Sequence, residues 1–204
     1  MTYGDGNPLY GYGPLVSVDI AGHEMAHGVT SRTAQLIYSG ESGGLNEATS
    51  DIFGTAVEFF AGSPADPGDY LIGEKIYLNN QSGEALRYMH DPGLDGRSKN
   101  CWYSGIGSVD VHYSSGVANH FFYLLAEGSS PANGPASPTC DGSVVTGIGR
   151  EKAEKIWYRA LTVYMTSNTS YAGARAATLQ AATDLYGPDT ADAVRAAWTA
   201  VSVL

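Results

Sequence analysis

The stretch His23-Glu24-Met25-Ala26-His27 constrains the fold of this 204-residue chain more than any other feature. On an α-helix, residues four apart lie on the same face, one turn from each other. His23 and His27 would then point in one direction and could bind a single metal ion. Glu24 would project beside them, within reach of a water molecule held at that ion. The pattern H-E-x-x-H is typical of helical zinc hydrolases, but so short a motif also arises by chance.

The rest of the sequence predicts a mainly helical fold around this motif. Residues 1–16, rich in glycine and tyrosine, predict a short β-hairpin or irregular strand, and residues 62–112 predict a long loop with short elements. The expected helices cover 18–32 (capped by Ser17), 45–60 and 114–126, with a bundle of three more in 150–204. We divide the chain into residues 1–62, with the motif's helix pair, and residues 63–204, both within one compact unit.

The second expected helix carries Glu47 and Asp51, again four residues apart. If the first two helices pack antiparallel across the short connection between them, His27 lies opposite Glu47 and His23 lies opposite Asp51. Glu47 would supply the third ligand that a catalytic zinc site usually has. Asp51 would accept the second ring N–H of His23 and fix the orientation of that ring. The alternative is that both carboxylates belong to a solvated helix face.

Asp19 and Glu58 lie further along the same two helices, at the end where the helix pair is expected to bring them together. Asp69 and Glu74 follow shortly afterwards in the chain. Carboxylates that converge in a partly buried place repel one another unless a cation lies among them. A site with only oxygen ligands suits calcium. The alternative is that these acids face water.

Composition excludes some partners. The net charge of −10 and the pI near 4.7 argue against nucleic acid or an anionic membrane as a partner. No run of 18 apolar residues is present, so we expect no transmembrane helix. Cys101 and Cys140 do not form a C-x-x-C metal motif. They would pair in an exported protein and remain thiols in a cytosolic one.

The longer pattern Gly44-Leu45-Asn46-Glu47-Ala48-Thr49-Ser50-Asp51, twenty residues after the first motif, is far more specific than H-E-x-x-H. Together with Asp110-Val-His-Tyr-Ser-Ser-Gly, it resembles the thermolysin-like family of zinc metallopeptidases (gluzincins). The resemblance covers essentially the whole chain and implies the family's helical C-terminal domain. It also implies a secreted zinc endopeptidase that cleaves peptides and proteins before hydrophobic residues.

The resemblance assigns a role to each matching residue. Zinc ligands would be His23, His27 and Glu47, with Asp51 behind His23. Glu24 would be the general base, and Tyr38 and His112 would donate hydrogen bonds to the oxyanion, with Asp110 beside His112. Substrate would contact Arg87, Asn46, Ile20, Ile72 and Leu86. Calcium would bind Asp19, Glu58, Asp69 and Glu74.

The chain departs from the family pattern in three places. Gly107 stands where some members carry an aspartate that orients the equivalent of His112, and Asp110 is the nearest acid. Leu71 stands where some members carry a further calcium ligand. The family's long β-rich segment, which supplies one wall of the cleft, has no counterpart before Met1. The alternative function is therefore a domain that binds zinc and peptide but is inactive without that N-terminal segment, which would come as a separate chain.

Overall fold

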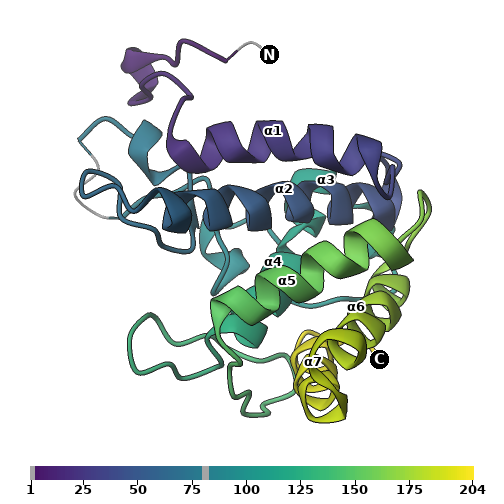
Figure 1. Cartoon of the computed structure of the whole chain (residues 1–204). Helices are drawn as coiled ribbons and strands as arrows, with labels where there is room; N and C mark the ends of the chain where they lie inside the picture. Colours follow the sequence, from purple (N-terminus) through teal and green to yellow (C-terminus); the bar gives the residue numbers. More distant parts are fainter. Residues whose placement is uncertain (1–2, 80–82) are drawn as a thin grey trace.

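Two long helices, α1 (Val18–Arg32) and α2 (Gly40–Ala61), lie side by side and carry the motifs described above (Figure 1). The computed structural model describes residues 3–79 and 83–204. The prediction of a mainly helical chain is confirmed. The further helices are α3 (Val111–Ser114), α4 (Gly116–Ala126), α5 (Arg150–Arg159), α6 (Tyr171–Tyr186) and α7 (Pro188–Ala200). None of the helices among the described residues is long and apolar enough to cross a membrane.

Glycines allow α1 and α2 to approach each other closely. A Cβ atom added to Gly54 of α2 would lie 2.4 Å from the backbone oxygen of Asp19 on α1. One added to Gly22 of α1 would lie 3.0 Å from the Cα atom of Gly54. The two backbones therefore meet where neither residue has a side chain, and this contact fixes the spacing of the helix pair.

The start of α2 differs from the prediction. The helix begins at Gly40, five residues before the expected start at Leu45, because Gly43 and Gly44 belong to it rather than to a loop. A Cβ atom on Gly43 would lie 2.5 Å from a methyl group of Val111, and one on Gly44 would lie 2.6 Å from the hydroxyl of Ser114. These glycines are required by packing against α3, which the sequence pattern does not reveal.

The N-terminal residues differ from the predictions in two details. Ser17 occupies the cap position of α1, but its side chain makes no capping hydrogen bond. In place of a regular hairpin, one of the two predicted forms, the described residues form a short 3₁₀ helix, η1 (Pro8–Tyr10), and isolated antiparallel bridges of Tyr12 with Asn7 and with Tyr77. Asn7 accepts the backbone N–H of Leu9, and the proline that follows it favours a helical turn. The first two residues of the expected hairpin lie outside the described part of the chain.

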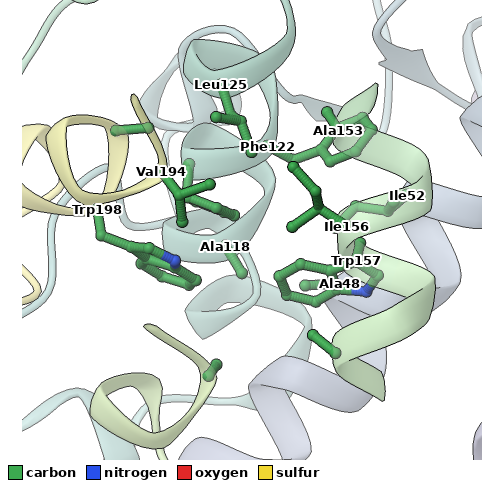
Figure 2. Close-up of a cluster of buried hydrophobic side chains, with 14 of the residues drawn as sticks. Ala48, Ile52, Ala118, Phe122, Leu125, Ala153, Ile156, Trp157, Val194 and Trp198 are labelled. Atoms are coloured by element: carbon green, nitrogen blue, oxygen red, sulfur yellow. The ribbon is translucent and has the colours of Figure 1, made fainter. Parts of the chain in front are cut away.

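Helix α4 lies at the centre of the hydrophobic core. Figure 2 shows Ala118 and Phe122 of α4 between Trp157 of α5 and Trp198 of α7. Both indole N–H groups find buried threonine hydroxyls, as buried tryptophans require: Trp198 donates to Thr178 at 2.8 Å and Trp157 donates to Thr49 of α2 at 3.3 Å. The core therefore joins the C-terminal bundle directly to the helix that carries Glu47 and Asp51.

The segment between α2 and α3 is irregular, as predicted, but it contains one small antiparallel sheet. Its strands are β1 (Leu71–Ile72) and β2 (Arg87–Tyr88), with Ile72 opposite Arg87. Four short elements complete the chain: η2 (Glu74–Ile76), η3 (Pro92–Asp95), η4 (Ile106–Ser108) and the π-helical turn Ala160–Tyr164. Cys101 and Cys140 form a disulfide, which decides between the two predicted states of these residues.

The glycine contact between α1 and α2 gives a test of the fold. We expect Gly54→Ala to lower the free energy of unfolding by about 2 kcal/mol, because the added methyl group would push the helices apart. Gly28→Ala in α1 is the matched control, since the nearest atom to its added Cβ is a flexible arginine nitrogen at 3.9 Å. That substitution should stabilise the chain by about 0.5–1 kcal/mol. Urea unfolding of both variants measures the difference, and equal effects would contradict the close contact.

Candidate metal centre and active site

His23, His27 and Glu47 converge between α1 and α2. The Nε2 atom of His23 lies 3.5 Å from Oε2 of Glu47, and Nε2 of His27 lies 3.5 Å from Oε1. One ligand atom from each residue lies within 4.8 Å of the other two. Oε2 of Glu47 is buried and has no hydrogen-bond partner among the described residues. Two imidazoles and a carboxylate with an unsatisfied buried oxygen fit the donor set of a zinc ion.

Asp51 holds His23 in place. Its Oδ1 atom lies 2.7 Å from Nδ1 of His23, as the antiparallel register predicted. Arg87 of β2 donates two hydrogen bonds, of 2.8 and 2.7 Å, to the same carboxylate. Asn119 of α4 donates a further hydrogen bond to it at 2.8 Å. Burial alone would raise the pKa of Asp51, but the Arg87 guanidinium and the bond to His23 hold it far below its usual range. Asp51 is therefore a carboxylate that orients His23 with Nε2 facing Glu47.

His27 is oriented in a similar way by two residues of α2. Its Nδ1 atom lies 2.8 Å from Oδ1 of Asn46 and 3.2 Å from the hydroxyl of Ser50. The amide nitrogen of Asn46 in turn donates to the backbone oxygen of Leu36 at 2.8 Å. Both polar atoms of Asn46 already bond within the protein, so we interpret it as the group that orients His27. Its predicted contact with substrate stays a prediction.

Tyr38 and His112 come from distant parts of the chain and meet at Glu47. The Tyr38 hydroxyl lies 3.2 Å from Nε2 of His112 and donates a short hydrogen bond to Oε1 of Glu47. Burial and this bond raise the pKa of Tyr38 above its usual value. Nδ1 of His112 lies 2.8 Å from Asp110, which also accepts the backbone N–H of His112 and so begins α3. The backbone N–H, and then the ring, lower the pKa of Asp110.

A cavity of about 500 Å³ opens beside these residues, lined by Leu86, Arg87, His112 and several tyrosines. Leu86, a predicted substrate contact, lines this cavity, and its role stays a prediction. Ile20 and Ile72 are buried nearby, and a Cβ atom on Gly73 would touch both Leu86 and Ile20. Glu24 lies between the two histidines on α1 and is exposed.

A second cluster lies at the other end of the helix pair. Carboxylate oxygens of Asp19, Glu58 and Glu74 lie within 4.8 Å of one another, and all three residues are buried. Burial above all, with repulsion from the neighbouring carboxylates, raises the pKa of Glu58 and of Glu74 to about 8. Asp69 borders the cluster: its backbone N–H donates to Glu58 at 3.0 Å, while its carboxylate accepts the N–H of Leu71 at 2.7 Å. Three buried acids in one place fit a calcium ion.

Sequence reasoning missed Asn119 and Ser50, and it did not find that Arg87 binds Asp51. The signal for Asn119 was a single amide within the apolar stretch 116–126, because a buried amide needs partners. Ser50 lies one turn after Asn46 and follows the same face of α2. No local pattern pairs Arg87 with Asp51, since they are 36 positions apart and the described residues between α2 and β2 are mostly irregular.

Comparison with known proteins gives the family. Residues 34–203 match the thermolysin metallopeptidase, alpha-helical domain, and residues 1–31 match the thermolysin metallopeptidase, catalytic domain. The chain is 61% identical to the transglutaminase-activating metalloprotease of Streptomyces mobaraensis over 209 residues, which is 100% of this chain and 27% of that protein. It is 44% identical to bacillolysin of Bacillus cereus over 208 residues, which is 100% of this chain and 35% of that protein.

A solved structure agrees with this result. The precursor of protealysin, a metalloproteinase from Serratia proteamaculans, matches with a TM-score of 0.73 and 30% sequence identity over 99% of this chain and 62% of that one. The site therefore lies in a metallopeptidase fold, and the chain belongs to the thermolysin family of metallopeptidases. It spans about a third of the length of the curated relatives that it matches.

The carboxylate cluster predicts an unusual pH dependence for the metal-free protein. A carboxyl group with a higher pKa in the folded state binds its proton more tightly there than in the unfolded state. Ionisation of this group at higher pH therefore destabilises the folded state. We expect the free energy of unfolding to fall as pH rises from about 4.5, the ordinary value, to about 8. Glu58→Gln should make this fall shallower, whereas Glu151→Gln on the exposed side of α5 should not. Urea unfolding at several pH values in a chelator measures both slopes, and equal slopes would contradict the raised pKa.

Proposed function

We propose that this chain carries the metal centre of a zinc endopeptidase, with His23, His27 and Glu47 as zinc ligands. The observation that carries the proposal is their convergence around a buried oxygen of Glu47 that lacks a partner among the described residues. Family membership supports the choice of zinc and of peptide substrates. The disulfide supports export to an oxidising compartment, since such bonds seldom persist in the cytosol.

In the proposed mechanism, Glu24 transfers a proton, and Asp51 fixes the position of the proton on His23. Bound zinc would polarise the scissile carbonyl and lower the pKa of an attacking water. Glu24 would take the proton from that water and later give it to the leaving amine. Asp51, held by Arg87 and Asn119, keeps the Nδ1 proton of His23 in place so that Nε2 stays free as a ligand.

Tyr38 and His112 are the proposed oxyanion donors. Both reach the same place beside Glu47, where negative charge would develop on the carbonyl oxygen. The hydroxyl of Tyr38 bonds Glu47 in this structure, so it would turn to the substrate as the reaction proceeds. Asp110 would hold His112 with Nε2 facing the substrate. Removing one such donor typically costs on the order of 10²–10³ in rate.

Substrate would lie in the cavity beside Leu86 and Arg87. Leu86 lines this cavity, and a Cβ atom on Gly73 would touch both Leu86 and the buried Ile20, so apolar side chains lie beside it and support a preference for a hydrophobic residue after the scissile bond. Arg87 comes from the segment 63–204 and Asp51 from the segment 1–62, so we propose that the two segments act as one unit.

We also propose a calcium ion between Asp19, Glu58 and Glu74, with Asp69 nearby. Three buried carboxylates repel one another, and Oδ1 of Asp19 and Oε1 of Glu58 have no hydrogen-bond partner among the described residues. A divalent cation would offset this repulsion and fix β1 against the helix pair through the N–H of Gly73, which donates to Asp19.

A specific observation favours the alternative function, in which the chain needs a further β-rich N-terminal segment. The outer face of α1 and α2 exposes large apolar side chains: Met25, Val29, Val57 and Phe60, the last 93% exposed. They line a groove of about 750 Å³. Exposed apolar surface of this extent marks an interaction site. Since the relatives are about three times longer, we propose that such a segment covers this face and completes the cleft.

The catalytic proposal is tested by peptide cleavage with one equivalent of zinc. We expect Glu24→Gln to lower kcat/KM by at least about 10³-fold, because the general base is removed while the ligands stay. Zinc binding measured by atomic absorption should be unchanged. Glu151→Gln is the matched control and should keep full activity. Failure of the parent chain to bind zinc would contradict the metal site, whereas zinc binding without cleavage by the parent would favour the alternative.

The calcium proposal is tested by thermal unfolding with and without 5 mM calcium, which is about 100 times a dissociation constant on the order of 50 μM. We expect calcium to raise the melting temperature, and by more at pH 8 than at pH 6, because Glu58 and Glu74, with pKa values raised to about 8, are mostly protonated at pH 6. Glu58→Gln should abolish most of this rise. A similar rise in the variant would contradict the assignment of the ion to this cluster.

A further inference from the structure

A second cavity lies apart from the proposed zinc ligands, and of the proposed calcium residues only Asp69 is among its lining residues. It has a volume of about 620 Å³, within the usual range for small-molecule sites. Its walls come from the end of α2, from the two strands, from α4 and from the loop 133–135. Most of its lining is apolar, and none of the proposed zinc ligands or oxyanion donors takes part in it.

Aromatic rings form its floor and walls. The ring of Tyr70 packs edge-on against Tyr123, with 4.8 Å between their centres, and lies 5.3 Å from Phe59. The ring of His90 lies 5.9 Å from Tyr123 and 6.1 Å from Tyr88. These contacts fix the rings before any ligand arrives. The negative faces of such rings attract cations.

Glu127, at the end of α4, supplies a negative charge within this lining. The hydroxyl of Tyr70 donates to its Oε1 atom at 2.5 Å and so fixes the carboxylate. The positive charge of Arg150 also acts on Tyr70, but its guanidinium pairs with Glu154 at 2.5 Å and lies 4.1 Å from the ring centre of Phe59. That contact shows a cation already held on the ring of Phe59.

His90 adds a polar atom without a positive charge. Its Nδ1 atom is buried and has no hydrogen-bond partner among the described residues. Burial lowers the pKa of His90 below its usual value, so the ring is neutral at pH 7 and does not repel a cation. A neutral imidazole nitrogen can accept a hydrogen bond from an ammonium group.

We propose that this cavity binds an alkylammonium ion, with its charged end at Glu127 and its carbon chain against the rings of Tyr70 and Tyr88. The lysine side chain of a peptide and a free primary amine both present this chemistry. A neutral apolar compound could fill the same space, but it would gain nothing from the carboxylate. The proposal does not depend on peptidase activity, because the cavity and its charge are separate from the metal centre.

The test is a titration of the full chain, followed by NMR chemical shifts of backbone amides, at pH 7 in low salt. The probes are n-butylammonium and N-acetyl-lysine-N-methylamide, with 1-pentanol and N-acetyl-norleucine-N-methylamide as neutral counterparts. We expect each ammonium probe to bind about tenfold more tightly than its counterpart. Equal binding of the two ammonium probes would indicate a free amine, and tighter binding of the lysine derivative would indicate a peptide.

Variants place the interaction in the cavity. Glu127→Gln keeps an oxygen for the Tyr70 hydroxyl and should weaken both ammonium probes about tenfold while leaving the neutral probes unchanged. Asp184→Asn is the matched control, because Asp184 also accepts a tyrosine hydroxyl, from Tyr164, but on an exposed surface. Unchanged affinity in Glu127→Gln, or equal binding of charged and neutral probes, would overturn the proposal.

Discussion

The site and much of the fold depend on the hydrogen bonds that the carboxylate of Asp51 makes. It is fully buried, and its three partners come from α1, β2 and α4. A buried charge is tolerated only when it is paired and hydrogen-bonded, so each partner is required by the others. Through this one group the irregular segment and the core helix are both held against the helix pair, and His23 receives its orientation.

Much of the metal centre could be predicted because helices repeat regularly. Once His23 and His27 are placed on one helix and Glu47 and Asp51 on another, an antiparallel arrangement leaves few choices of register, and the structure shows the expected pairs. The carboxylate cluster around Asp19 and Glu58 follows from the same register. Helical periodicity therefore predicts which side chains of α1 and α2 lie opposite each other along the length of the helix pair.

The rest depended on contacts between segments that have no periodicity. The partner of Arg87 is set by how β2 returns to α2, and the early start of α2 is set by the tight packing of Gly43 and Gly44 against α3. The sequence predicts a substrate contact for Asn46 but does not reveal that its side chain also bonds His27 and a backbone carbonyl. An amide side chain can both donate and accept hydrogen bonds, so it has several possible partners. The three-dimensional structure is needed to identify them.

The glycine contact of α1 and α2 has a consequence for protein engineering. Gly22 and Gly54 place backbone against backbone, so the separation of the metal-ligating side chains is set by main-chain atoms rather than by the packing of apolar groups. Designers could therefore vary the hydrophobic residues around the helix pair widely, with the ligand spacing retained. The same feature makes the pair a suitable scaffold for transplanting a two-histidine, one-carboxylate centre into another helical protein.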